Sequence, residues 1–435
     1  MIGIDDTIVA CSTPPGIGAI SCIRVSGPSS SSIFKKITNK KFLHLCVSVS
    51  NIQLEEDIDE KCVLTSYKKP NSYTGEDSFE ISCHGNPLIV DLLIKKIIEM
   101  GCRSAEPGEF TMRSFLNNKI GLIEAEAVSD LIHAESIRKL KAVGKSLKGE
   151  FTKKVDEIIL ELREIRTKVE SEIDFNDQDI KLNKEELVSK LDDFKINLEE
   201  FVSLTQDAVY FNEGIKTVIT GPPNAGKSSL MNYLTKNDTS IVSEKSGTTR
   251  DLITRSVKIG QFLFKFYDTA GILDSTEDLI ELEGISKAEK ALLNCDLVIE
   301  MVDCSQLDYK KDYPGKKSLR IINKTDLSDE STEADIRISL KTGKNTEILN
   351  ETLIKAAFSS KNPSIDGFSA RTRHLMLLKD CLESLCETKE LNLDDSLELV
   401  AEHLRVCSDI LGQIKDPYSS DDLLGNIFST FCIGK

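Results

Sequence analysis

The sequence lacks a Cys-x-x-Cys pair, a long apolar run, a basic N-terminal segment and an excess of positive charge. Its twelve cysteines are scattered along a chain long enough to fold without disulfides, so we expect a reducing, intracellular environment. No stretch reaches about 18 uninterrupted apolar residues, and residues 1–6 carry two acids and no base, so neither membrane spanning nor secretion is expected. Lys and Arg number 55 against 71 Asp and Glu, and the formal charge of −16 excludes a surface that holds nucleic acid by bulk attraction.

The chain has 435 residues, which is too long for one core at roughly 100 to 200 residues per domain. Apolar residues make up 40% and charged residues 29%, as in soluble globular proteins, so a collagen-like or wholly disordered chain is excluded. Residues 1–118 mix short β-rich runs with Pro and Gly turns and one predicted helix, Pro87–Met100. This mixture indicates a compact N-terminal α/β domain.

The pattern changes three times in the rest of the chain. Within residues 119–211, apolar residues from Val155 to Ile173 recur at spacings of three and four, which predicts a long amphipathic helix. Residues 212–370 alternate strand-like runs, Gly-rich turns and helix-like runs, as in an α/β domain with a mainly parallel sheet. Residues 371–435 return to helical periodicity. We therefore predict a multidomain α/β plus all-α fold, in which the second α/β domain is inserted between two parts of a helical domain.

The segment Gly221–Ser228 has the spacing G-x-x-x-x-G-K-[ST], between the strand-like run Ile215–Ile219 and the helix-like run Ser229–Leu234. This context predicts a P-loop, whose backbone N–H groups wrap phosphates. There Lys227 would reach the β- and γ-phosphate oxygens, and the Ser228 hydroxyl would ligate Mg²⁺. The nucleotide contacts expected from this loop are Asn224, Ala225, Gly226, Lys227, Ser228 and Ser229.

Three further segments favour GTP over ATP in a Ras-like domain. Asp268-Thr269-Ala270-Gly271 follows a strand-like run, which would place a carboxylate near Mg²⁺ and a backbone N–H near the γ-phosphate. Asn323-Lys324-Thr325-Asp326 resembles the NKxD motif of GTPases, in which the Asp accepts from guanine N1 and N2, a pairing that adenine cannot offer. Ser339-Leu340-Lys341 stands where GTPases have Ser-Ala-Lys, whose main chain meets guanine O6. The order and spacing of these motifs predict a guanine nucleotide site.

Hydrolysis requires a positioned water and a positive charge on the transition state. Ile272 follows Gly271 where Ras-like enzymes have a Gln, and an alkyl chain cannot orient water. Residues 274–283 offer five acids for this task, although a solvated switch loop would look the same. The charge would come from Arg250, which is equally well read as a surface residue, or from a monovalent cation beside Asn224. Thr249 is the expected switch I ligand of Mg²⁺.

Together with these motifs, Gly247-Thr-Thr-Arg-Asp251 and the terminal Cys432-Ile-Gly-Lys435 closely resemble the MnmE (TrmE) family of tRNA modification GTPases of bacteria and organelles. The resemblance runs from end to end. Its other landmarks are Thr7–Ala10, Thr13–Gly16, Tyr73–Asp77, Pro107–Phe110, Ile173–Phe175 and Ser420–Gly425.

The resemblance implies a cytoplasmic homodimer, joined through N-terminal domains that bind a one-carbon donor. That donor would be 5,10-methylenetetrahydrofolate, with 5-formyltetrahydrofolate as an analogue. GTP hydrolysis in the family is stimulated by K⁺. With the FAD-containing MnmG, in a heterotetramer, the family adds an aminomethyl or carboxymethylaminomethyl group to C5 of the wobble uridine (position 34) of certain tRNAs.

The resemblance also assigns roles to residues at matching motif positions. Glu281 would orient the water, and Cys432 would lie near the one-carbon chemistry. The folate contacts would be Arg24, Glu80, Lys119 and Lys435, and the K⁺ ligands would be Asn224, Ser243, Lys245 and Thr248. Ser243 stands where the family is expected to have Thr. The rest of the nucleotide-contacting segment would be Glu244, Ser246, Gly247 and Thr249.

Some features have more than one interpretation. The basic stretch from Arg138 to Lys154 would suit tRNA phosphates, but an ordinary solvated helix face is the simpler interpretation. Cys83-His84-Gly85 has no second ligand pair at metal-binding spacing, which favours a structural turn. Two other functions compete with tRNA modification. One is an Era-like GTPase of ribosome assembly, which would lack the terminal Cys-Ile-Gly-Lys, and the other is a non-catalytic GTP switch, which Ile272 weakly favours.

Overall fold

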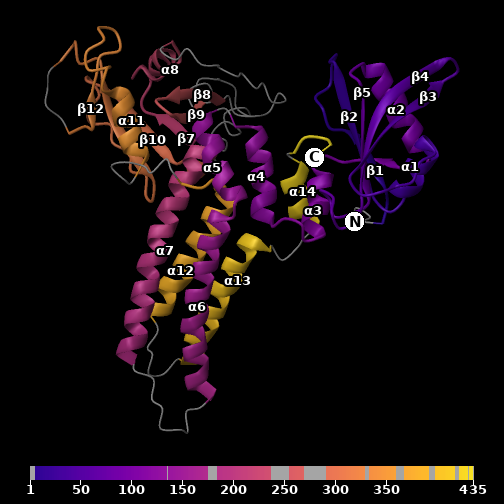
Figure 1. The fold of residues 1–435 in the computed structure, drawn as a ribbon. Helices are drawn as coiled ribbons and strands as arrows, with labels where there is room; N and C mark the ends of the chain where they lie inside the picture. Colours follow the sequence, from indigo (N-terminus) through magenta and orange to yellow (C-terminus); the bar gives the residue numbers. More distant parts are fainter. Residues whose placement is uncertain are drawn as a thin grey trace, which may run out of the picture. The chain divides into compact units, whose positions relative to one another are not determined.

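The computed structural model describes residues 5–134, 136–174, 184–236, 254–268, 291–328, 333–358, 367–390, 397–416, 421–429 and 431–434 (Figure 1). The chain divides into two compact units. One comprises residues 1–135, 143–174 and 396–435, and the other comprises residues 136–142 and 175–395. The predicted class, a multidomain α/β plus all-α fold, is confirmed.

The N-terminal part is a six-stranded sheet of order β3-β4-β5-β2-β1-β6, in which only the short pair β1 and β6 is parallel. Its elements are β1 (Ile8–Cys11), β2 (Ile20–Ser26), α1 (Ser30–Thr38), β3 (Cys46–Glu55), β4 (Ile58–Tyr67), β5 (Ser78–His84), α2 (Pro87–Glu99) and β6 (Arg103–Ser104). The helix predicted from Pro87 is present as α2, because Asn86 accepts the Leu88 N–H and Pro87 fits the first turn. Ile23, Phe34 and Phe79 lie in the core between the sheet and these helices.

The helical parts form pairs of packed helices. The elements are α3 (Glu109–Leu116), α4 (Leu122–Ile132), α5 (Ile137–Leu147), α6 (Glu150–Asp174), α7 (Lys184–Glu213), α12 (Thr372–Glu390), α13 (Leu397–Lys415) and α14 (Asp421–Ser429). Helix α6 packs against α13, and α7 packs against α12 (Figure 1). The predicted amphipathic helix is confirmed as α6, since Val155, Leu162 and Val169 are buried along one side.

The second sheet has the order β12-β11-β10-β7-β9-β8, and all neighbouring strands are parallel except β8 and β9. Its elements are β7 (Ile215–Thr220), α8 (Lys227–Lys236), β8 (Thr254–Ile259), β9 (Phe262–Asp268), β10 (Leu297–Asp303), β11 (Lys317–Asn323), β12 (Ile336–Arg337) and α11 (Leu349–Ala357). Every residue of β10 is buried, as expected for the middle of a parallel sheet covered on both faces. The prediction of a mainly parallel sheet is confirmed.

A search of the described helices for one long and apolar enough to cross a membrane finds none.

Candidate functional site

The loop between β7 and α8 has a backbone conformation that requires glycine at two positions, Gly221 and Gly226. Gly221 has φ +143°, and a Cβ there would lie 1.9 Å from the Met301 carbonyl oxygen. Gly226 has φ +104°, and a Cβ there would lie 2.3 Å from Nδ2 of Asn323. Any side chain at either position would therefore collide with β10 or with the residue that ends β11. The glycines of the P-loop pattern are required by packing as well as by access to phosphates.

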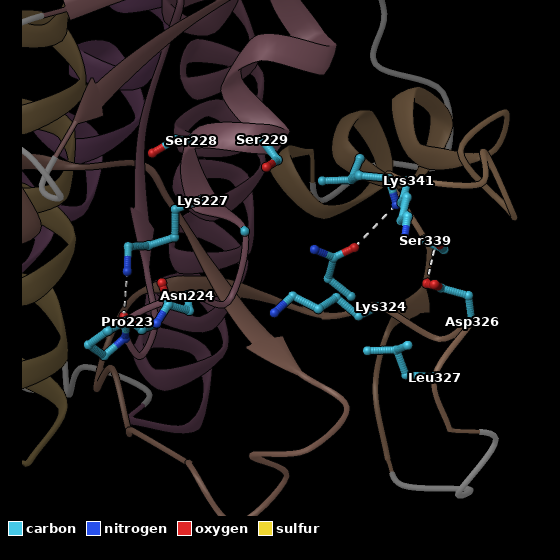
Figure 2. A pocket seen from close by; sticks show the side chains of 14 residues that line it. Pro223, Asn224, Lys227, Ser228, Ser229, Lys324, Asp326, Leu327, Ser339 and Lys341 are labelled. Carbon is cyan, nitrogen blue, oxygen red and sulfur yellow. Dashed lines mark hydrogen bonds between the residues drawn. The ribbon is translucent and has the colours of Figure 1, made fainter.

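This loop borders a cavity of about 670 Å³, a size typical of small-molecule sites (Figure 2). The cavity is lined by Gly221, Pro223, Asn224, Gly226, Lys227, Ser228, Ser229, Asn323, Lys324, Asp326, Leu327, Ser339, Leu340 and Lys341. Figure 2 shows Lys227 and Asn224 on one side of it and Asp326 and Ser339 on the other. The structure thus gathers three predicted motifs around one space.

The buried Asn323 joins these three motifs. Its Nδ2 donates to the Ala225 carbonyl at 3.0 Å, and its Oδ1 accepts the Leu340 N–H at 3.2 Å. The Ser339 hydroxyl donates to Oδ1 of Asp326 at 2.6 Å and lowers the pKa of that carboxyl. Asp326 is therefore held as an ionised acceptor at the edge of the cavity, where a base with two neighbouring N–H donors would pair with it.

The P-loop side of the cavity carries the predicted cation Lys227 and the hydroxyls of Ser228 and Ser229. The Lys227 ammonium donates to the carbonyls of Gly221 at 2.9 Å and Pro222 at 3.0 Å, so it lies within the loop (Figure 2). Ser228 and Ser229 open α8, and helix N-termini favour phosphate because their N–H groups point outward.

Asp303, which sequence reasoning missed, holds the Asn323-Lys324 segment in place. It ends β10 and forms an ion pair with Nζ of Lys324, while its Oδ1 accepts the Ser305 N–H at 3.0 Å. The Cys304 N–H donates to the Asn323 carbonyl at 3.1 Å. The adjacent residues Asp303 and Cys304 therefore both bind the Asn323-Lys324 segment. Burial alone would raise the pKa of Asp303, but the Lys324 and Ser305 hydrogen bonds outweigh it and lower that pKa. The only signal in the sequence was an acid at the end of a buried strand, which is too common to be diagnostic.

Other predicted nucleotide and metal residues lie outside the described residues. Asp268 ends β9 opposite Ile219, which places its backbone at the carboxyl edge of the sheet, but its side chain is not among those described. The remaining predicted residues outside the described ranges are Ser243, Glu244, Lys245, Ser246, Gly247, Thr248, Thr249, Arg250, Thr269, Ala270, Gly271, Glu281 and Lys435.

A second group of predicted residues meets in the N-terminal sheet. Arg24 on β2 stands directly opposite Glu80 on β5, and its Nη2 and Nε donate to Oε1 of Glu80 at 2.8 and 3.0 Å. The guanidinium also lies over the rings of Tyr73 and Phe110, at 5.4 and 5.7 Å from the centroids. The Tyr67 hydroxyl donates to Oε2 of Glu80 at 3.4 Å, and burial together with that carboxylate raises the pKa of Tyr67. The charged pair thus has a fixed orientation.

Lys119 and the C-terminal segment are held against the same N-terminal part. Lys119 passes over Gly75, where a Cβ would lie 3.1 Å from Cγ of the lysine. The Ser12 hydroxyl donates to the Gly434 carbonyl at 3.1 Å, and the Gly108 N–H donates to the carbonyl of Cys432 at 3.3 Å. Cys432 itself is exposed. Residues 432–434 therefore lie against the part that carries Arg24 and Glu80.

Cys83 and His84 are the last two residues of β5, so the turn predicted for Cys83-His84-Gly85 begins only at Gly85. The Nδ1 atom of His84 lies 2.9 Å from Oε1 of buried Glu60, and the His84 N–H donates to the same oxygen at 2.8 Å. No cluster of three or more His, Cys, Asp or Glu suited to a metal occurs in the part of the chain that the structure describes.

Comparison with known proteins gives matches over almost the whole sequence. Residues 7–119 match the family model described as the GTP-binding protein TrmE N-terminus, and residues 122–432 match that of the MnmE helical domain. The chain is 37% identical over 452 residues to the tRNA modification GTPase MnmE of Mannheimia succiniciproducens and 38% identical over 446 residues to that of Legionella pneumophila strain Philadelphia 1. Each alignment covers 99% of this chain and 99% of the relative.

Proposed function

The chain belongs to the MnmE (TrmE) family of tRNA modification GTPases, and on that premise we propose that it couples K⁺-stimulated GTP hydrolysis to folate-dependent modification of tRNA. The proposed GTP site rests mainly on two hydrogen bonds of the Asn323 side chain, one to Ala225 and one to Leu340. These bonds join the P-loop to the segment after β12 around one cavity, which supports a phosphate site and a base site in the same space. Asp326 would select guanine, and Lys227 would bind the β- and γ-phosphates.

The residues around the phosphate site fit the metal ions that the family implies. Ser228 offers a hydroxyl for Mg²⁺, with Thr249 as the second protein ligand, and Asn224 offers an amide oxygen at the cavity wall. With Ser243, Lys245 and Thr248, Asn224 would hold K⁺, whose charge would stabilise the transition state as an arginine finger does. Glu281 would orient the attacking water, a task that Ile272 cannot perform. Arg250 is a second candidate for the positive charge.

We expect hydrolysis to be at least about tenfold faster in K⁺ than in Na⁺, and Glu281→Ala to lower kcat about 100- to 1000-fold with GTP affinity kept. The measurement is phosphate release by purified protein in matched chloride buffers, with nucleotide affinity from a fluorescent GTP analogue. Asp278→Ala, from the same acidic segment, is the matched control and should hydrolyse GTP normally. Equal rates in both salts, or normal turnover by the Glu281 variant, would favour the non-catalytic switch instead.

The N-terminal group has the chemistry of a reduced folate site. Lys119 and Lys435 can pair with the glutamate carboxylates of folate, and Glu80 can accept from the amino and ring N–H groups of the pterin. Arg24, which is paired with Glu80, would contact the same end of the folate. The site would hold 5,10-methylenetetrahydrofolate, and Cys432 would lie beside the one-carbon group. We propose that a cytoplasmic homodimer performs this step with the FAD-containing MnmG, in a heterotetramer, on C5 of the wobble uridine.

Glu80→Gln should weaken the binding of 5-formyltetrahydrofolate about 10- to 100-fold, because the amide loses the charge that orients Arg24 and presents donors to the pterin. Isothermal titration calorimetry would measure this affinity, and GTP hydrolysis should stay at the wild-type rate. Glu55→Gln is the matched control, an exposed glutamate of the same sheet. If the Glu80 variant binds the folate as tightly as the control, the proposed pterin contact is wrong.

A further inference from the structure

We propose that one face of α5 binds the phosphate backbone of tRNA, an inference that rests on the proposed function in tRNA modification. This α5 basic face consists of Arg138, Lys141, Lys145 and Lys148. The four cations recur at spacings of three, four and three, which places them on one side of a helix. The Lys148 N–H donates to the Gly144 carbonyl at 3.2 Å, so the helical turn extends to the last of them.

The opposite side of the same helix is the packed side. Ala142, Val143 and Ser146 are buried, whereas Arg138, Lys141 and Lys148 are exposed and Lys145 is half-exposed. Lys139 points differently from the α5 basic face, because its Nζ donates to the Asn212 carbonyl at 2.8 Å. Lys139 thus has a structural contact, whereas the α5 basic face points toward solvent.

The like charges of α5 destabilise the helix. Residues 137–148 contain five cations and no acid, and four of these cations form the α5 basic face. Neighbouring members of this face repel one another at i,i+3 and i,i+4. Other surface helices of the chain place acids at these spacings instead. Their i,i+4 ion pairs are Arg166–Glu170, Glu186–Lys190, Lys195–Glu199 and Glu351–Lys355. Lys145 has an acid nearby, since its Nζ lies 3.9 Å from Oε2 of Glu150, the first residue of α6. A row of four cations with this one ion pair, in a chain of net charge −16, is best explained by an anionic partner.

A polyphosphate backbone fits this row better than a protein partner does. The face extends about 15 Å along the helix axis and presents one long, flexible cation every turn or less, which suits repeating charges more than a shaped pocket. Phosphate contacts position a nucleic acid without reading its sequence. The α5 basic face would therefore hold tRNA while other groups select the uridine.

The test is tRNA binding by the full-length protein in the presence of GTP, measured by fluorescence anisotropy with labelled bulk bacterial tRNA over a series of salt concentrations. The triple variant Arg138→Gln, Lys141→Gln, Lys148→Gln should bind about tenfold or more weakly near 0.1 M salt. Its plot of log affinity against log salt concentration should be shallower by about 2 to 3, close to one for each phosphate that the variant no longer neutralises. The charge-conserving variant Arg138→Lys, Lys141→Arg, Lys148→Arg should keep the wild-type slope.

A matched control removes the same charge elsewhere. Lys35→Gln, Lys36→Gln, Lys61→Gln neutralises three exposed lysines of the N-terminal part and should bind tRNA as the wild type does. Both triple variants should hydrolyse GTP at the wild-type rate, which shows that they are folded. Equal losses in both triple variants, or no loss in the α5 variant, would overturn the inference, and the second result would leave an acidic protein as the partner of this face. A wild-type protein that does not bind tRNA would overturn the tRNA function as well.

Discussion

Asp326→Asn is expected to lower the affinity for GTP by roughly two to three orders of magnitude and to create binding of xanthosine triphosphate. A carboxylate accepts from guanine N1 and N2, whereas an asparagine amide also presents donors, which would face donors of the base. Xanthine carries an acceptor oxygen in place of the 2-amino group, so the amide can satisfy it. The Ser339 hydroxyl, 2.6 Å from Oδ1 of Asp326, would hold the new side chain in the same orientation.

The measurement is the affinity of the wild type and the variant for fluorescent GTP and xanthosine triphosphate in Mg²⁺ and K⁺. Asp308→Asn is the matched control, since it makes the same chemical change at an exposed position of the same domain. It should bind GTP normally and xanthosine triphosphate no better than the wild type. An Asp326 variant that keeps its preference for guanine would show that another group reads the base, and the assignment of the 323–326 segment would be wrong.

The cavity proposed to bind the nucleotide could be predicted from the sequence because its signals are local. Gly221, Gly226 and Lys227 occur at fixed spacing between a strand and a helix, and the glycines are forced by contacts with Met301 and Asn323. The sheet type also follows from short-range pattern, since buried parallel strands appear as continuous apolar runs. Asp303 was missed because its partner Lys324 is 21 residues away, and nothing in the sequence near either residue indicates the pair.

The N-terminal part was less predictable because its structure depends on distant contacts. Strand β6 has two residues, too few for an alternating pattern, and it pairs with β1 across most of the domain. Residues 432–434 are held by hydrogen bonds to residues far away in the sequence, such as that between Ser12 and Gly434, which are 422 residues apart. Composition and periodicity cannot indicate such a contact, so Arg24, Glu80, Lys119 and Lys435 were assigned by resemblance alone.

A network of buried charges around Arg113 lies beside the proposed folate site, and the sequence pattern did not predict it. Arg113 is 1% exposed and pairs with Glu109, which is wholly buried, at 2.9 Å. It also pairs with Asp6 and with Glu76, and Glu76 accepts from the hydroxyl of Ser26, two residues beyond Arg24. Arg113 thus connects α3 to the strand that presents Arg24.

Arg113→Met should destabilise this part of the protein by about 3 to 5 kcal/mol. Methionine fills much of the same space but removes the cation paired with Glu76 and leaves buried Glu109 with Arg103 alone, and a buried charge that loses a partner is costly. The measurement is urea denaturation followed through hydrogen exchange of the β1 and β2 amides, which report on this sheet directly. Arg405→Met is the matched control, because Arg405 pairs with Glu402 and Asp409 on an exposed helix surface and should cost no more than about 1 kcal/mol.

The difference between Arg113→Met and the wild type should depend on pH. Burial alone would raise the pKa of Glu109, but its hydrogen bonds from Arg103, the Glu106 N–H and Arg113 outweigh this effect and lower that pKa below the ordinary value. A carboxyl with a lowered folded-state pKa stabilises the protein above its unfolded pKa of about 4, and the stabilisation is lost as pH falls through the folded-state value. The variant lacks part of this stabilisation, so its deficit should be largest near neutral pH and should shrink below about pH 4. A deficit that does not change with pH would mean that Arg113 acts through packing rather than through the charges of Glu109 and its neighbours.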